Sequence, residues 1–276
     1  MNKKIKVFLD VILFLIAFAV IQIAVEYGTA ALLGYMRNMK VKEAIYGMAT
    51  GKYGAVLAIS TVLSSLLTIL LFARLKWTPM SRKYLRSRPW NVFLWIILLS
   101  LGIILPAEWI EEKLQIVMDP AYQKLFDGVM REPWGYVAIG LLAPIAEETV
   151  FRGAILRSLL GVFSDKWHWI PILISALLFG LVHGNFAQGA YAAVIGLLLG
   201  WMYYRTGSIL PGLILHWVNN SVAYILFNLM PQMEDGKLID FFHGNQRLMT
   251  GGLIFSFCIV IPSIFQLYGR MKRAKE

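Results

Sequence analysis

Residues Gly135–Leu160 read GYVAIGLLAPIAEETVFRGAILRSLL, an apolar stretch long enough to cross a bilayer. Two adjacent carboxylates, Glu147 and Glu148, and an arginine, Arg152, nevertheless lie inside it. An ionisable side chain at this depth costs about 3 kcal/mol or more, so such residues usually face a protein interior or a water-filled cavity and mark function. The stretch therefore predicts both a membrane-embedded helix and the position of the protein's chemistry.

The composition supports a polytopic membrane protein. The 276 residues are 58% hydrophobic and only 15% charged, with a mean hydropathy of +0.65, whereas a soluble domain carries roughly 25% charged residues. The net charge of +10 is explained by basic loops on the cytoplasmic side, and no nucleic-acid partner is expected. The single cysteine, Cys258, cannot form an intrachain disulfide and gives cysteine catalysis little support.

Eight apolar stretches are candidates for membrane spans, each near the length of about 17 to 25 residues that a helix needs. The first follows Lys3, Lys4 and Lys6 and is expected to be a retained helix, because it is long for a signal peptide and lacks a clear cleavage site. The predicted spans are Val7–Val25, Ala55–Ala73, Val92–Ala107, Trp134–Leu156, Trp169–His183, Ala187–Tyr204, Ile209–Leu229 and Gly251–Leu267.

The charges between these stretches predict the orientation. Most Lys and Arg residues, 17 of 26, fall on one side. They lie in the N-terminus, the loop Arg74–Arg88, the stretch Arg152–Lys166, at Arg205 and in the C-terminal tail that includes Lys275. Most acids fall on the other side, in the loops Glu26–Lys52, Glu108–Glu132 and Met230–Arg247. The positive-inside rule then places both termini in the cytoplasm.

No repeat or soluble insertion divides the chain, so residues 1–276 are expected to form a single all-α membrane domain, with residues 133–229 as its catalytic core helices. The segment Ala30–Gly51 mixes apolar and basic residues. It is expected to be either an interfacial amphipathic helix or a connecting loop with helical turns.

Helical geometry divides the two glutamates. Glu148 and Arg152 are four residues apart and meet on one helix face, whereas Glu147 points about 100° away from Glu148. Glu148 and Arg152 either form a structural ion pair or take part directly in the chemistry. No basic residue of its own helix serves Glu147, which favours Glu147 as a general base.

Two histidines in later apolar stretches complete the constellation. His183 ends a span and is either a capping residue at the membrane interface or a member of the site. His216 and Asn220 share a helix face, where they are either polar contacts between helices or donors to a developing oxyanion.

The ordered set Glu147-Glu148-x-x-x-Arg152, Phe179-x-x-x-His183 and His216-x-x-x-Asn220 resembles the CPBP family of intramembrane proteases. This family, also called ABI, includes the CAAX prenyl endopeptidases of eukaryotes and many bacterial proteins. The resemblance covers about 133–229 and includes all three motifs.

The resemblance implies peptide hydrolysis within an eight-helix fold in a membrane. For a bacterial member of the family, this is the cell membrane. Glu147 and His183 would activate water, and His216 and Asn220 would stabilise the oxyanion. Glu148, Arg152 and Phe179 would support them. The substrate would be a peptide or protein, lipidated or not.

Alternatives to a metal-free protease remain. Two histidines and a glutamate are also a zinc ligand set, so zinc is not excluded, although asparagine is a poor zinc ligand and no cofactor is favoured. A transporter would more often show inverted repeats, and none is visible. A non-catalytic bacteriocin-immunity or scaffold protein is the other alternative. The retention of all motif positions argues against it.

Overall fold

The computed structural model describes residues 2–230 and 237–273, and within them the chain forms helices and no strand, as predicted. The predicted loop Met230–Arg247 and the basic tail with Lys275 lie partly outside the described residues. The long helices are α1 (Lys3–Arg37), α3 (Gly54–Arg74), α5 (Trp90–Lys113), α10 (Phe186–Thr206), α11 (Leu210–Leu229) and α13 (Gln246–Arg270). The shorter ones are α2 (Val41–Ala49), α4 (Lys83–Arg86), α6 (Pro120–Met130), the 3₁₀ turn η3 (Asp165–Trp167), α9 (Trp169–Leu181) and α12 (Leu238–Phe241).

The six long helices of the described chain are long and apolar enough to cross a membrane. This makes the protein an integral membrane protein. Two further spans were predicted. One corresponds to α9, whose 13 residues fall short of the roughly 20 that cross a bilayer. The other corresponds to a composite helix, so the count of eight spans and the cytoplasmic position of the termini stay predictions.

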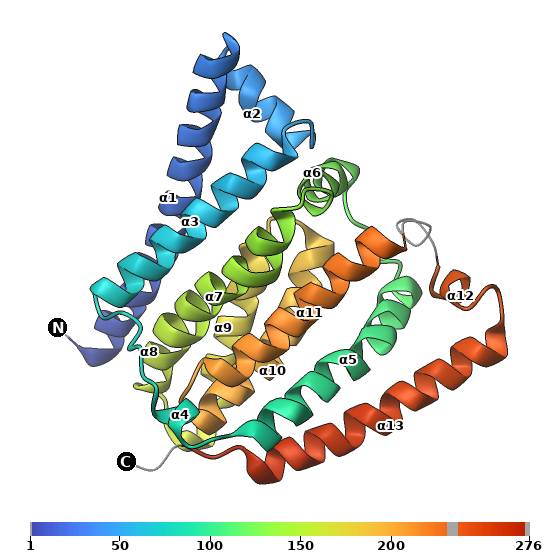
Figure 1. Ribbon diagram of the computed structural model, residues 1–276. Coiled ribbons are helices and arrows are strands. Elements are labelled where there is room, and N and C mark those ends of the chain that lie inside the picture. Colours follow the sequence, from blue (N-terminus) through green and yellow to red (C-terminus); the bar gives the residue numbers. More distant parts are fainter. Residues whose placement is uncertain (1, 231–236, 274–276) are drawn as a thin grey trace.

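The composite helix occupies the centre of the bundle. It consists of four consecutive parts, the π-helical η1 (Tyr136–Leu142), α7 (Ala143–Glu148), the π-helical η2 (Thr149–Leu156) and α8 (Arg157–Leu160). It packs against α1, α3, α9 and α11, and Figure 1 shows it running between α3 and α11. The side chains of η2 are buried on every face, which places this stretch inside protein and away from lipid.

The segment Ala30–Gly51 is helical on both sides of a turn. Helix α1 continues to Arg37, and Asn38 then takes a left-handed conformation with φ 51°, which asparagine tolerates well. Helix α2 folds back so that Ala44 and Met48 pack against Ala30 of α1. A helix is therefore present here, and its position at the membrane interface stays a prediction.

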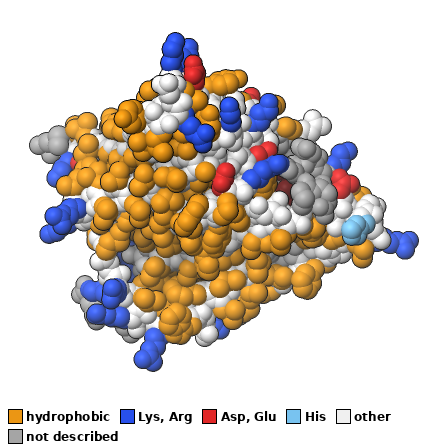
Figure 2. Space-filling model, turned by 45° about the horizontal axis from the view of Figure 1, so that its top comes forward, with side chains coloured by type: hydrophobic (Ala, Val, Ile, Leu, Met, Phe, Trp, Pro, Cys, Tyr) orange, Lys and Arg blue, Asp and Glu red, His pale blue; other side chains and the backbone are white. Residues whose placement is uncertain are grey.

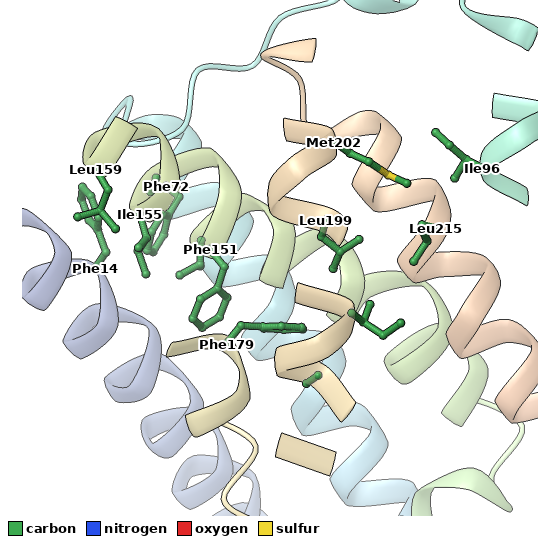
Figure 3. Packing of buried hydrophobic residues seen from close by; sticks show 14 of the residues in the cluster. Phe14, Phe72, Ile96, Phe151, Ile155, Leu159, Phe179, Leu199, Met202 and Leu215 are labelled. Atoms are coloured by element: carbon green, nitrogen blue, oxygen red, sulfur yellow. The ribbon is translucent and has the colours of Figure 1, made fainter. Parts of the chain in front are cut away.

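The buried core surrounds the composite helix. Figure 3 shows Phe151 beside Phe179, with Phe14 and Phe72 on one side and Leu199 on the other. The outer faces of the bundle are apolar as well, because residues such as Phe255 and Phe265 of α13 are 67% and 75% exposed. Figure 2 shows hydrophobic side chains over most of one face with Lys and Arg at its margins, a surface that suits a lipid environment.

Candidate active site

A proline shapes the first half of the composite helix. In η1 the hydrogen bonds run from residue i to i−5, and Ala143 N–H donates to the carbonyl of Ala138. The next bond in this pattern would come from residue 144, which is Pro144 and has no N–H. The carbonyl of Ile139 is left free and accepts a hydrogen bond from Asn220 Nδ2 at 3.1 Å. The proline thus creates the anchor for Asn220.

Side chains from neighbouring elements hold the second half. In η2 the carbonyl of Thr149 accepts from Thr78 Oγ1 at 2.6 Å, and the carbonyl of Phe151 accepts from Ser175 Oγ at 2.8 Å. Arg157 Nε donates to the carbonyl of Gly153 at 2.9 Å. A π-helix is rare and needs such compensation. The bonds from Thr78 and Ser175, which come from other elements, restrain the rotation of the helix that carries the glutamates.

Glu148 and Arg152 form the predicted pair. Arg152 Nη1 lies 2.8 Å from Glu148 Oε1, and both side chains are 0% exposed. Arg152 Nη2 also donates to the carbonyl of Gly196 at 3.2 Å, and its guanidinium lies 4.5 Å from the centre of the Phe179 ring. The arginine is therefore held by a carboxylate, a carbonyl and an aromatic face at once.

His216 lies between the two glutamates. Its Nε2 is 3.6 Å from Glu147 Oε2, and its Nδ1 is 3.5 Å from Glu148 Oε1. Neither contact has the geometry of a hydrogen bond, and Nδ1 has no hydrogen-bond partner in the described chain. Glu148 is 0% exposed and Glu147 is 20% exposed, so the two adjacent carboxylates differ in access. Glu147, the more accessible one, is the better placed to meet a substrate.

His183 has a fixed ring orientation. Its Nδ1 lies 2.8 Å from the carbonyl of Phe179, and because a carbonyl only accepts, Nδ1 carries the hydrogen. The neutral ring then presents Nε2 as an acceptor. An acceptor nitrogen can take a proton from water, which is the function expected of this residue.

The Phe179 ring is the common contact of the site. The rings of His183 and His216 meet it edge-on, with centroid separations of 5.0 and 5.6 Å, and Arg152 lies over its face. Sequence reasoning assigned Phe179 a supporting function without this geometry. In the structure its ring contacts both histidines and Arg152.

Glycines bring α9 and α10 together behind the site. A Cβ at Gly180 would lie 2.5 Å from the carbonyl oxygen of Gly189, and one at Gly189 would lie 2.8 Å from that of Gly180. The close approach allows the carbonyl of Gly196 to reach Arg152.

The predicted residues form one connected group with two looser members. Glu147, Glu148, Arg152, Phe179 and His216 make the contacts described above. In the described part of the chain no hydrogen bond joins His183 to Glu147 or Asn220 to His216. His183 is placed through Phe179, and Asn220 through Ile139.

Two features of the site escaped sequence reasoning. A Cβ at Gly212 would lie 2.9 Å from Glu148 Oε2, so this glycine makes room for the buried carboxylate. Its position one helical turn before His216 is the only signal in the sequence. The other feature is a cavity of about 220 Å³ between α5, α6, α10 and α11, lined by Asn219 beside Asn220 and by Tyr191. Tyr191 donates a hydrogen bond to Asn219.

The site residues do not fit a zinc centre. Within residues 2–230 and 237–273, no group of three or more His, Cys, Asp or Glu side chains could hold a metal ion. The two nitrogens of His216 each face a different carboxylate, and His183 could offer only Nε2 to a metal, because its Nδ1 is bonded to a carbonyl.

Comparisons with known proteins agree with the motifs. Residues 130–222 match the model of the Rce1-like type II CAAX prenyl endopeptidase family, which confirms the family resemblance and includes every predicted site residue. The match supports a membrane endopeptidase at the level of the family. The chain is also 30% identical over 131 residues to an uncharacterized 24.3 kDa protein of Escherichia coli, a region that is 45% of this chain and 54% of that protein. The chain thus spans about half the length of that relative, and no solved structure matches.

Proposed function

From this family match, we propose that the chain is an intramembrane endopeptidase that hydrolyses a peptide bond with water activated by Glu147. The observation that carries the proposal is the position of His216, whose Nε2 lies 3.6 Å from Glu147 and whose Nδ1 lies 3.5 Å from Glu148. The surrounding bundle buries Glu148 and Arg152 completely. A reactive carboxylate, a histidine and a fixed counter-charge are thus assembled away from bulk water, where electrostatic interactions are strongest.

The reaction begins at Glu147. Its carboxylate accepts a proton from water, with His183 Nε2 as the second acceptor that holds the water, and the oxygen of that water adds to the scissile carbonyl carbon. The carbonyl oxygen becomes an oxyanion. As the tetrahedral intermediate collapses, the C–N bond breaks and the protonated Glu147 returns the proton to the leaving amine.

Asn220 and His216 stabilise the oxyanion. Asn220 Nδ2 carries two hydrogens, of which one is used on the carbonyl of Ile139, so the second is available for a substrate oxygen. The first bond also fixes the amide in place, and donors that need no rearrangement contribute most. Glu148 and Arg152 hold His216 and Phe179 in position from behind.

The substrate is proposed from the family description, which points to a peptide or protein at the membrane with a prenylated C-terminal CAAX sequence. No contact in the structure selects a prenyl group, so the lipid is the variable to test. Two matched probes separate the possibilities, a farnesylated CAAX peptide and the same peptide with a free cysteine.

The decisive experiment compares Glu147→Gln with the wild type on both probes, using protein purified in one detergent. Glutamine keeps the size and the hydrogen-bonding capacity of glutamate and cannot take the proton, so cleavage should fall by at least about 100-fold. The melting temperature should change little, because Glu147 makes no short ion pair. Cleavage by the variant at a rate near that of the wild type would rule out Glu147 as the base.

A further inference from the structure

A second cavity lies at the opposite end of the composite helix from Asn220, away from the catalytic group. It has a volume of about 790 Å³, is partly open, and is lined by the α3–α4 connection, the α8 end of the composite helix, the α10–α11 connection and the C-terminal segment. Figure 1 shows α4, α8 and the last turns of α13 gathered at this end of the molecule. The proposed hydrolysis does not use this cavity.

The lining of the cavity is basic and contains no acid. Four cationic side chains surround it, and among the lining residues there is no Asp or Glu. They are Arg82, Lys83, Arg157 and Arg273. Four like charges around one space repel each other, and an anion in that space would be attracted by all four and offset part of the repulsion.

One of these cations is held ready by the fold. Arg157 donates from Nε to the carbonyl of Gly153 and from Nη2 to the carbonyl of Trp77 at 2.7 Å. Its Nη1 makes no hydrogen bond with any described residue. A guanidinium fixed by two backbone carbonyls loses little conformational entropy when it binds a ligand, and its planar donors match phosphate oxygens.

The C-terminal segment is also fixed over the cavity. Arg205 Nη2 donates to the carbonyl oxygens of Tyr268 at 2.7 Å and Met271 at 3.2 Å, and the Met271 side chain is fully buried. The side chain of Arg273 then lies 3.9 Å from the position that a Cβ on Gly207 would occupy. The fourth cation therefore belongs to the wall of the cavity.

Neutral donors and apolar side chains complete the lining. The Tyr84 hydroxyl carries its proton at neutral pH, as tyrosine normally does, and can donate; burial raises its pKa further, to about 12. Ser81 and Ser208 add two more hydroxyl groups. Met80, Leu160 and Ile209 supply apolar surface beside the charges, as an amphiphile requires and inorganic phosphate does not.

We propose that this cavity binds the phosphate of an anionic phospholipid, with its glycerol and upper acyl chain against the apolar wall. Basic pockets between membrane helices are known to bind such headgroups. The bound lipid bridges the α3–α4 connection to the C-terminal segment and so stabilises this end of the bundle. On the predicted orientation, the lipid comes from the cytoplasmic leaflet.

The test uses the full chain purified in a neutral detergent, with phosphatidylglycerol, phosphatidylcholine of the same acyl chains, or inorganic phosphate added. Native mass spectrometry measures lipid affinity and thermal unfolding measures stabilisation. Phosphatidylglycerol should bind at least about 10-fold more tightly than phosphatidylcholine and raise Tm. Equal binding of the two lipids would overturn the proposal, and equal stabilisation by inorganic phosphate would show that the site takes soluble phosphate instead.

Matched variants separate the cavity from general surface charge. Combined Arg82→Gln, Lys83→Gln and Arg273→Gln replaces three exposed cations of the cavity and should weaken phosphatidylglycerol binding by about 100-fold. The control replaces Lys3, Lys4 and Lys6 by Gln, three exposed cations of α1 outside the cavity, and should change binding little.

The single variant Arg273→Gln tests the cavity even if the triple variant fails to fold. Arg273→Gln lies beyond the end of α13, and alone it should weaken binding by about 5-fold with Tm in detergent unchanged. Equal losses in the cavity and control triples, or no loss in Arg273→Gln, would show that the cavity is not the binding site.

Discussion

Replacing Arg152 by methionine tests how the site is supported. Methionine retains a long side chain in a position that is 0% exposed but removes the charge. The change eliminates the 2.8 Å contact with Glu148 and the bond to the carbonyl of Gly196, and it removes the cation from the face of Phe179. Glu148 would remain as a buried carboxylate with only His216 Nδ1 nearby, at 3.5 Å.

The expected magnitude follows from that geometry. Removing one partner of a buried ion pair costs about 3–5 kcal/mol, because the remaining charge is left without compensation. His216 can compensate in part, which favours the lower end, about 3 kcal/mol. For a chain of this size each kcal/mol corresponds to about 2–4 °C, so Tm should fall by roughly 6–12 °C. Cleavage should also slow, because Phe179 contacts both histidines.

The control is the double variant Arg152→Met with Glu148→Gln, in which no charge is left unpaired. It should recover part of the lost stability, since replacing a buried ion pair by neutral groups is often close to neutral. Melting temperature and cleavage rate are measured on the same preparations in one detergent. If Arg152→Met melts with the wild type, or the double variant is less stable than the sum of the single losses, the supporting function of the pair is wrong.

Three further outcomes are expected. His216→Ala should lower kcat by about 100-fold or more with little change in Tm, because an oxyanion donor acts mainly in the transition state and His216 Nδ1 has no hydrogen bond to lose. Unfolding of this variant would instead make His216 the supporting residue and Arg152 the candidate for a direct catalytic function. Exhaustive chelation should leave cleavage unchanged, whereas stoichiometric zinc with activity restored only by metal would make the histidines ligands. On a Cys258→Ser background, Ser87→Cys should resist an impermeant thiol reagent in intact cells, because the exposed Ser87 lies in the loop predicted to be cytoplasmic; labelling would invert the topology.

The sequence by itself determined the class of the protein and proposed its reactive residues. Apolar length and charge asymmetry predict an all-helical membrane protein, because these signals are local and each helix satisfies its own backbone in lipid. The contact between Glu148 and Arg152 was also predictable, since positions i and i+4 meet on any α-helix. The remaining site residues came from the ordered motifs, which name residues and carry no distances.

Only the tertiary structure decided how those residues meet. Glu147 has no partner in its own helix, and its neighbour His216 comes from α11, at a distance set by the rotation and tilt of two helices that hydropathy does not encode. The free carbonyl of Ile139 depends on a π-helical turn ahead of Pro144, a change of hydrogen-bond register that the proline alone does not specify. The basic cavity likewise combines segments that are at least 75 residues apart in the sequence, because folding brings Arg82, Arg157 and Arg273 around one space.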